Sequence, residues 1–399
     1  MTRPGQEGAP KKRGFFQHPA WYLWPLPALL AFLAQRLLAN APEIVEQWHV
    51  QHLFRWLSIP LSWVSSLLPF SIAEMLLILG CPILLGLFIW WLVRLFRQKN
   101  RLARSGRLLC RLAWTASILY LLFMLLHGLN YARLPVAESF SLPVRERDAA
   151  DLESAAVWLA DRASELRVSL DEDDSGVFAL EQGVSMTLRQ AVEGYAVASA
   201  EYPLLGGPSI RPKGVLLSHY WSYTGIAGLY FPFLVESNIN IDMPDYQIPA
   251  TTLHEIAHTR GFAREDEAGF IAFLAGISHT RQDFAYSVML DAAVRCLNSL
   301  YGADQDAYQA AAGHLSQAVW RDLGAGNDYW KQFAGPVQEA SSDVNNAYLQ
   351  ANLQDDGIQS YGRMIDLVLA WYETKAAAGT LDQSIAVLQD PAVNQAEAA

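Results

Sequence analysis

The sequence predicts an α-helical membrane anchor of three transmembrane helices, followed by a mainly α, α+β domain. Two observations predict this division. Apolar stretches gather in the first third of the 399-residue chain, and each approaches the roughly 20 residues that a helix needs to cross a bilayer. The rest shows helical apolar spacing with one extended region. We therefore expect a cytoplasmic tail and anchor at residues 1–131, a folded domain at residues 132–389 and a disordered tail at residues 390–399.

The predicted membrane spans are the three apolar stretches Trp21–Leu38, Ile72–Val93 and Leu112–Leu129. Pro25 and Pro27 interrupt the first span, which follows a basic segment and ends in an Ala-Asn-Ala sequence that resembles a signal-peptidase site. We expect this span to stay uncleaved, because two further spans follow it; cleavage is the alternative. Residues 44–68 are rich in Trp, Leu and Ser, which favours an amphipathic segment at the membrane interface.

Basic residues predict the orientation in the membrane. Residues 1–13 and the loop at residues 94–111 carry most of the Lys and Arg of the anchor, and such segments stay in the cytoplasm. The domain after the third span is then extracytoplasmic. It carries 16 Lys and Arg against 36 Asp and Glu, and this acidic balance argues against nucleic acid as a partner. The sequence leaves the oligomeric state open.

The predicted elements of the outer domain are mostly helices. Helical spacing covers Asp151–Leu170, Met186–Ala200, Glu265–Ile277, Asp283–Leu300, Asp306–Leu323 and Ser360–Ala376. Alternation and β-branched residues predict extended chain at Gly214–Leu217 and Leu229–Ile241. Three cysteines, one of them in the outer domain, provide no disulfide framework.

The sequence His254-Glu255-Ile256-Ala257-His258 is the strongest chemical signal in the chain. Residues four apart share one face of a helix, so His254 and His258 can bind one Zn²⁺ ion while Glu255 serves as general base. Thr252 and Glu255 have the spacing of a capping box, which predicts that the helix begins near Thr252. A structural histidine pair without metal is the alternative.

A catalytic zinc ion usually takes three protein ligands. Gly261 permits a sharp turn, and the acidic start of the next predicted helix supplies Glu265 as third ligand, with Glu267 as a rival. Arg264 stands where a metzincin carries its third histidine, which argues against that class.

Two resemblances extend this interpretation. Residues 265–272 resemble the E-x-x-A-[DN]-x-x-A signature of gluzincin-type membrane proteases such as the CAAX prenyl proteases, which implies that Glu265 is the third zinc ligand; Gly269 departs from the usual Asp or Asn. The chain also resembles the bacterial membrane family called domain of unknown function 3810, which implies a membrane-anchored, zincin-like zinc peptidase without an established substrate. The matching segments are residues 128–133, 228–233 with Glu236 and Asn240, 254–268, 286–287, 352–357 and 360–362.

The sequence therefore predicts a zinc metallopeptidase at the outer face of the bacterial cytoplasmic membrane, acting on envelope peptides or proteins. Glu255 is the expected general base, and Tyr286 is the candidate donor to the oxyanion of the tetrahedral intermediate. Phe231–Ile241 is the candidate strand to which an extended substrate pairs, with an internal strand as the alternative. The alternative function is a catalytically inactive zinc-binding membrane protein with a structural or sensory role.

Overall fold

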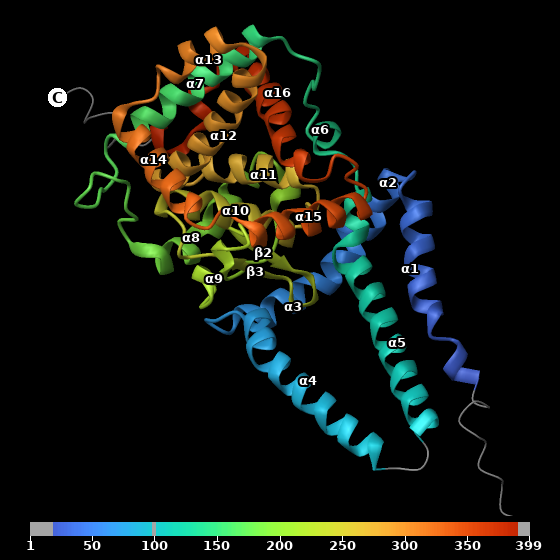
Figure 1. Ribbon diagram of the computed structural model, residues 1–399. Coiled ribbons are helices and arrows are strands. Elements are labelled where there is room, and N and C mark those ends of the chain that lie inside the picture. The colour runs from blue at the N-terminus through green and yellow to red at the C-terminus, as the bar shows by residue number, and fades with distance from the viewer. Residues whose placement is uncertain (1–18, 98–100, 390–399) are drawn as a thin grey trace, which may run out of the picture.

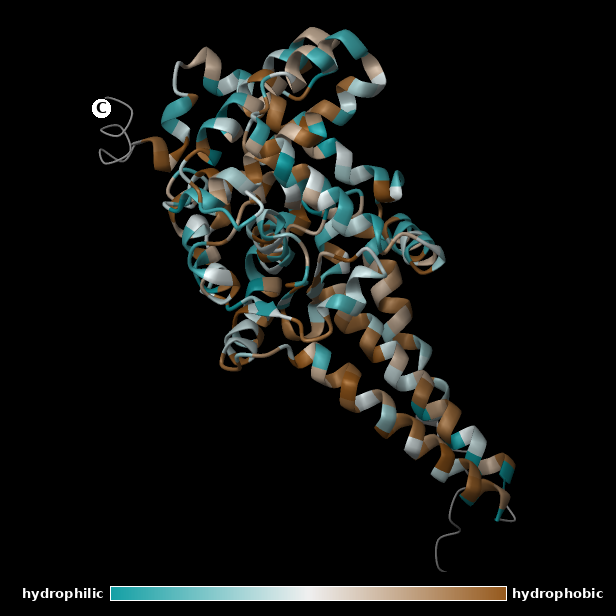
Figure 2. Cartoon of the chain, turned by 60° about the vertical axis from the view of Figure 1, so that its left-hand side comes forward, coloured by the Kyte–Doolittle hydropathy of each residue, from teal (hydrophilic) through white to brown (hydrophobic). Residues whose placement is uncertain are grey.

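Two long apolar helices extend from one side of a mostly helical domain in the computed structural model, which describes residues 19–97 and 101–389 (Figure 1). They are α4 (Ile72–Phe96) and α5 (Arg101–Leu126), and both are long and apolar enough to cross a membrane. Figure 2 shows apolar residues along these extended helices, whereas polar residues cover much of the domain. The basic tail before residue 19 and the predicted disordered tail at residues 390–399 lie outside the described residues.

The first predicted span has a different form from the other two. Helix α1 (Pro25–Leu38) has 14 residues, and a 3-10 turn, η2 (Pro19–Tyr22), replaces its expected beginning. At about 1.5 Å per residue, α1 is only about 21 Å long. It meets the helical stretch Pro42–Ser66 at 118°, and the bent pair together counts as a third candidate span. The anchor thus has two or three candidate spans.

The stretch after α1 consists of α2 (Pro42–Ile44), the π-helix η3 (Val45–Phe54) and α3 (Arg55–Ser66). Serines form the buried side of α3, whereas Trp56 and Trp63 are exposed. An exposed side that is more apolar than the buried side is typical of a helix that contacts lipid. The interfacial position predicted for residues 44–68 stays a prediction, because Pro42–Ser66 also belongs to the bent candidate span.

A small sheet joins the anchor to the outer domain. Its strands are β1 (Lys213–Gly214), β2 (Gly228–Phe231) and β3 (Glu236–Ile239), in the order β1-β3-β2. The single extended segment predicted at Leu229–Ile241 is wrong, because the 3-10 turn η6 (Pro232–Leu234) and a left-handed Val235 separate two antiparallel strands. The extended segment predicted at Gly214–Leu217 is also too long, since the chain turns into α9 (Ser218–Ser222).

Helices make up the rest of the outer domain. The longer ones are α7 (Ala149–Arg167), α8 (Gly183–Ala198), α10 (Ile248–Thr259), α11 (Glu265–Ile277), α12 (Gln282–Ala303), α13 (Gln305–Ala312), α14 (Gln317–Lys331), α15 (Pro336–Ala351) and α16 (Met364–Ala377). Short elements connect them: η4 (Gly128–Ala132), α6 (Val136–Ser139), η5 (Pro203–Leu205), η7 (Asp245–Gln247), η8 (Gly357–Arg363), η9 (Asp382–Ser384) and η10 (Ala386–Gln389).

Two helix predictions need correction, and one helix was missed. The helix predicted at Asp306–Leu323 is two helices, because Ser316 accepts a hydrogen bond from the amide of Val319 and begins α14 anew. The helix predicted at Ser360–Ala376 begins as the 3-10 turn η8. Helix α15 was not expected at all. In contrast, α11 has the predicted bounds.

Helix α11 lies at the centre of the core. It packs against α8, α10, α12 and α16, and nearly all of its residues are buried. A helix that is apolar all round needs such a position. Its first residue, Glu265, is thereby held inside the protein beside the end of α10.

Two buried glutamates fasten α4 to the outer domain. The Glu236 carboxylate accepts hydrogen bonds from the amides of Ile72 (3.1 Å) and Ala73 (3.0 Å) at the first turn of α4. The Glu74 carboxylate accepts from the amides of Leu216 (2.9 Å) and Leu217 (2.7 Å). Carboxylates at a helix N-terminus are stabilising because they satisfy free amides. The beginning of α4 and the sheet are therefore fixed to each other.

Candidate metal centre

Helix α10 begins four residues before its predicted start. It runs from Ile248, and the Thr252 hydroxyl donates to the Ile248 carbonyl (2.7 Å), as a residue inside a helix does. Thr252 is therefore not an N-cap, and the expected capping box with Glu255 is wrong. The helix ends at Thr259, so His258 lies in its last turn, where the helix dipole favours a cation. The carboxylate of Glu255 is left free for another role.

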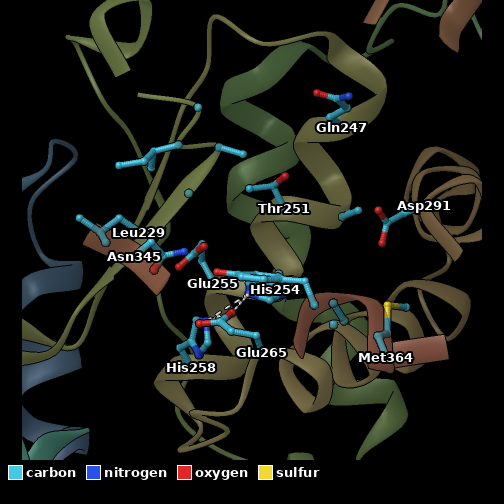
Figure 3. A pocket seen from close by; sticks show the side chains of 18 of the residues that line it. Leu229, Gln247, Thr251, His254, Glu255, His258, Glu265, Asp291, Asn345 and Met364 are labelled. Carbon is cyan, nitrogen blue, oxygen red and sulfur yellow. Dashed lines mark hydrogen bonds and ion pairs between the residues drawn. The ribbon is translucent and has the colours of Figure 1, made fainter. Parts of the chain in front are cut away.

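Three donor atoms converge beside α10. His254 Nε2 lies 3.0 Å from Glu265 Oε2 and 3.1 Å from His258 Nε2, and His258 Nε2 lies 3.5 Å from Glu265 Oε2. Ligands of a tetrahedral zinc ion with bonds of about 2.0–2.1 Å stand ~3.3 Å from one another. The triangle of donor atoms has this size, so the residues fit a zinc ion (Figure 3).

The backbone fixes the ring of His258. Its Nδ1 lies 2.8 Å from the Phe262 carbonyl oxygen, to which it can donate. The chain reverses for this contact at Gly261, whose φ of 87° lies in the left-handed region. A neutral imidazole that donates through Nδ1 presents a lone pair at Nε2. Such orientation of a histidine by a backbone carbonyl is typical of metal ligands.

The structure distinguishes the two candidate glutamates on α11. Glu265 faces both histidines, whereas the Glu267 carboxylate accepts from the amide of Val136 (2.8 Å) and pairs with Arg264 (2.9 Å). Glu267 is thus used to hold the chain near α6. The site contains Glu265 and not Glu267.

The charges in this cluster strongly affect the pKa values of His258 and Glu265. Burial opposes charge on His258, but the Glu265 and Glu255 carboxylates and the Phe262 carbonyl together outweigh burial and raise the pKa of His258 to about 9. Burial likewise opposes charge on Glu265, and His258 and His254 outweigh it to hold the pKa of Glu265 well below its usual range. Burial raises the pKa of Glu255. Two buried carboxylates beside two imidazoles form a set that a divalent cation would neutralise.

The donors lie in the wall of a cavity of about 800 Å³. Glu255 also lines this cavity, and its buried Oε2 has no hydrogen-bond partner among the described residues. Strand β2 passes close by: a Cβ added at Gly228 would lie 2.5 Å from Glu255 Oε1. Glu255 therefore presents an unused carboxylate oxygen beside the donor triangle, between α10 and the edge of the sheet (Figure 3).

Three aromatic residues near the donors were not predicted from the sequence. The ring of Tyr361 in η8 stacks on His254, with centroids 6.3 Å apart, and the ring of His127 packs edge-on against His258 at 5.9 Å. Tyr348 of α15 lines the same cavity. These residues lie 90 or more positions from the motif, so no local pattern marked them. Tyr361 does fall within a segment that carries the family resemblance, and this was the available signal.

Gly269 explains how Tyr361 reaches His254. A Cβ at Gly269 would meet the sulfur of Met364 at 3.0 Å, so glycine permits close packing of α16 on α11. The His254 ring contacts the Glu265 carboxylate through Nε2, the ring of His258 edge-on, and the stacked ring of Tyr361. At position 269 the structure therefore has a close contact with Met364 in place of an Asp or Asn side chain.

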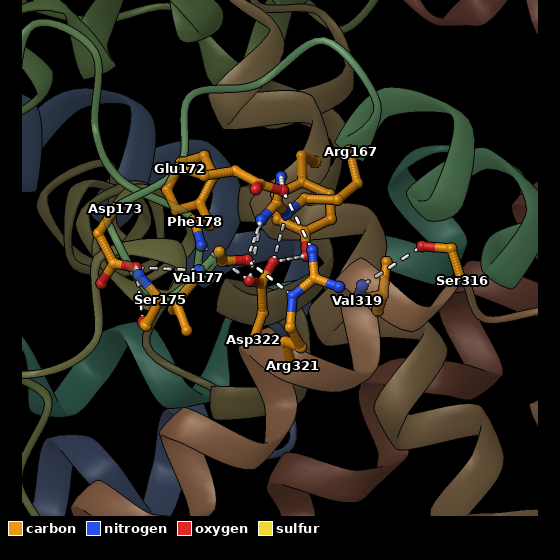
Figure 4. Close-up of polar contacts among 12 residues, drawn as sticks. Arg167, Glu172, Asp173, Ser175, Val177, Phe178, Ser316, Val319, Arg321 and Asp322 are labelled. Atoms are coloured by element: carbon orange, nitrogen blue, oxygen red, sulfur yellow. Dashed lines mark hydrogen bonds and ion pairs between the residues drawn. The ribbon is translucent and has the colours of Figure 1, made fainter.

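The side chain of Tyr286 belongs to a buried hydrogen-bond network and does not line the cavity. Its buried hydroxyl donates to Asp322, which also accepts from Arg167 (2.7 Å) and from the amide of Phe178 (2.8 Å) (Figure 4). The Arg167 and Asp322 side chains are almost completely buried. The hydroxyl is committed to this network, so the expected role of Tyr286 as oxyanion donor has no geometric basis.

Comparison with known proteins identifies one family. A family described as Protein of unknown function (DUF3810) matches residues 49–369. This range includes the donor triangle, Glu255, Tyr348 and Tyr361. No curated protein and no solved structure matches the chain.

Proposed function

The chain belongs to the family of proteins of unknown function DUF3810, and we propose that it is a membrane-anchored, zinc-dependent peptidase of zincin-like fold. One observation carries the proposal: His254, His258 and Glu265 direct three donor atoms to within 3.0–3.5 Å of one another in a cavity wall, beside the free carboxylate oxygen of Glu255. Three protein ligands that leave one position open are typical of catalytic zinc sites.

The donor types favour zinc over Mg²⁺ and Ca²⁺. Two imidazoles and one carboxylate suit Zn²⁺, whereas Mg²⁺ and Ca²⁺ prefer sites built from oxygen ligands alone. When bound, the ion supplies Lewis-acid chemistry, because it polarises a carbonyl and acidifies water. The orientation of His258 by Phe262 supports the same assignment.

Glu255 performs the proton transfers in this proposal. Its carboxylate takes a proton from the attacking water, whose oxygen forms a bond with the carbonyl carbon of the substrate. Glu255 then delivers that proton to the amide nitrogen, and the C–N bond breaks to release an amine and a carboxylate. A phenol hydroxyl is a suitable donor to the developing oxyanion. Tyr361 and Tyr348 are our candidates, since both line the cavity.

Strand β2 supports a peptide as the substrate. It pairs only with β3 among the described strands, so its other edge is available for an extended chain. Gly228 and Leu229 of β2 line the cavity beside Glu255. An extended peptide that adds to a sheet edge gains backbone hydrogen bonds whatever its sequence. The edge belongs to β2 and not to the predicted Phe231–Ile241, since β3 is internal and buried.

Zinc-dependent cleavage of a randomised peptide library tests the proposed function. The full-length protein, purified in detergent, should cleave the library with zinc and lose activity with a chelator. Glu255→Gln should retain zinc and lose roughly 10²–10⁴ in rate, which a positioned acid–base group usually contributes. Zinc binding with no cleavage by the parent protein would instead support the alternative, a catalytically inactive zinc protein.

A further inference from the structure

Helix α4 defines where the outer membrane boundary lies. From Ile72 to Val93 its length is about 33 Å at 1.5 Å per residue, which matches the ~30 Å thickness of a hydrocarbon core. No residue of its most apolar window is buried in the protein. Arg94 and Arg97 follow at the other end, where basic residues mark the cytoplasmic side. The outer boundary therefore falls near Ile72.

The contacts of the sheet give the length of chain between this boundary and the candidate site. Glu236 holds the amide of Ile72 and pairs across the sheet with Phe231 of β2. Gly228 lies three residues further along β2 and touches Glu255. Three residues of strand span about 10 Å. The path from the membrane boundary to Glu255 thus consists of one glutamate side chain and about 10 Å of strand, and this length is an upper limit on the distance of Glu255 from the boundary.

Helix α5 provides an independent measure of the same distance. His127 directly follows its last residue, Leu126, and packs against His258. The Tyr230 hydroxyl of β2 donates to the Leu126 carbonyl (3.4 Å). One terminus of each apolar helix, the beginning of α4 and the end of α5, therefore contacts β2 or β3. Helix α3 lies beside the sheet at the same level (Figure 1). The exposed tryptophans of α3 suit the interfacial region of a bilayer.

These distances indicate which class of substrate can reach the candidate site. We infer that the enzyme cleaves membrane-anchored polypeptides within about three to six residues of the outer membrane boundary. This inference rests on the proposed peptidase function. A chain that leaves the membrane beside Phe231 and extends along β2 advances about 3.3 Å per residue. It reaches Glu255 after three or four residues. Attachment to the same membrane also raises its effective concentration at the site.

The first test measures depth and does not depend on activity. A quenchable label is attached at Leu229→Cys in a full-length protein with Cys81→Ser and Cys110→Ser, whose remaining Cys296 is buried. The matched control carries Val168→Cys, an exposed position directly after α7. Helix α7 lies on the side of the domain away from α4 and α5 (Figure 1). In liposomes with a headgroup-linked quencher, the Leu229 label should be quenched severalfold more than the Val168 label. Equal quenching would overturn the inference.

The second test compares anchored and free substrates. One randomised dodecapeptide library is coupled at either terminus to phosphatidylethanolamine, and an uncoupled copy serves as reference. The enzyme is reconstituted in phosphatidylethanolamine–phosphatidylglycerol liposomes, with Glu255→Gln as the control for contaminating proteases. The coupled library should be cleaved at least tenfold faster, with mass spectra placing the cuts three to six residues from the anchor.

The outcomes separate the inference from the function on which it rests. Equal rates for coupled and free libraries, or cuts spread evenly along the coupled peptides, would overturn the inference and leave the peptidase intact. Cleavage of neither library would refute the peptidase and the inference together. A spacer of twenty residues between lipid and library should reduce the preference, because the anchored chain then no longer delivers its first residues to β2.

Discussion

At the scale of single residues, the shape of the site depends on a glycine. Gly228 brings β2 so close to Glu255 that a Cβ would lie 2.5–2.8 Å from three atoms of its side chain. Any side chain at this position displaces the carboxylate. A misplacement of about 1 Å in a catalytic group can reduce the rate 10²-fold.

Gly228→Ala should therefore reduce the cleavage rate by one to two orders of magnitude while zinc content stays unchanged. The measurement is kcat/KM alongside zinc per protein. Gly302→Ala is the matched control, because nothing lies within 4 Å of its added Cβ, and it should be neutral or slightly stabilising in α12. Full activity in Gly228→Ala would show that Glu255 need not stay where β2 holds it.

The buried network of Tyr286, Asp322 and Arg167 predicts a change in stability without a change in chemistry. Tyr286→Phe removes one hydrogen bond to a charged acceptor, which contributes about 1.5–3 kcal/mol. Asp322 keeps its contacts with Arg167 and with the amide of Phe178. The variant should melt at a lower temperature, yet retain its zinc and its kcat. A large loss of kcat at full zinc occupancy would show that Tyr286 takes part in catalysis.

The sequence predicted the local part of the site and missed the distant part. His254, Glu255 and His258 share a motif, and the acidic start of α11 delivers Glu265 only seven residues later. In contrast, His127, Tyr348 and Tyr361 reach the cavity through packing of α5, α15 and η8. Contacts between segments so far apart leave no periodic signal. Tyr286 was misjudged because its partner, Asp322, lies on another helix.

At the scale of elements, the clearest predictions came from strong patterns. Helix α11 matched its expected bounds because an acidic first turn and an apolar run mark both ends. Helix α15 is largely exposed and consists mostly of small and polar residues, so apolar spacing did not reveal it. The two strands β2 and β3 resemble one extended segment in the sequence because the residues of the turn between them, Pro232–Leu234, are themselves mostly apolar. Pro232 was the local sign that a strand ends there, because proline cannot donate a hydrogen bond to a sheet.

The attachment of α4 to the sheet is the element contact with the largest expected effect. Glu236→Ala leaves the amides of Ile72 and Ala73 without the carboxylate that satisfies them. An unsatisfied buried donor costs about 1–3 kcal/mol, so the melting temperature in detergent should fall by several degrees. Exposed Glu146→Ala is the control and should melt like the parent. Unchanged stability of Glu236→Ala would show that α4 is held by other contacts.

At the scale of the whole molecule, the anchor and the outer domain pack together. The predicted boundary after residue 131 falls inside η4, whose residues are all buried. Arg133 continues this junction: its guanidinium binds Glu46 of η3 (3.0 Å) and the Gly261 carbonyl (3.1 Å) at the turn after α10. The buried ion pair of Arg133 and Glu46 therefore connects η3 to the turn after α10, beside the candidate metal site. Sequence patterns predicted both parts of the chain, but they did not predict that the two parts pack against each other.

The charge distribution predicts the orientation of the whole molecule. The segment at residues 94–111, expected to be a loop but formed mostly by the end of α4 and the beginning of α5, carries seven basic residues and no acidic ones. This charge should keep it in the cytoplasm. A reporter fused after Ala399 should then be active only outside the cytoplasm. Replacing Arg94, Arg97, Arg104 and Arg107 with Glu should weaken this orientation. Cytoplasmic activity of the reporter on the unchanged protein would reverse the topology and the substrate class inferred from it.

Zinc content measured by elemental analysis tests the central claim most directly, because every proposed role depends on three protein ligands around one ion. The parent protein should hold about one zinc per chain. His258→Ala should lose it, whereas Glu255→Gln and the control His219→Ala, an exposed histidine on α9, should keep it. Stoichiometric zinc in His258→Ala, or loss of zinc in Glu255→Gln equal to that in His258→Ala, would contradict the account.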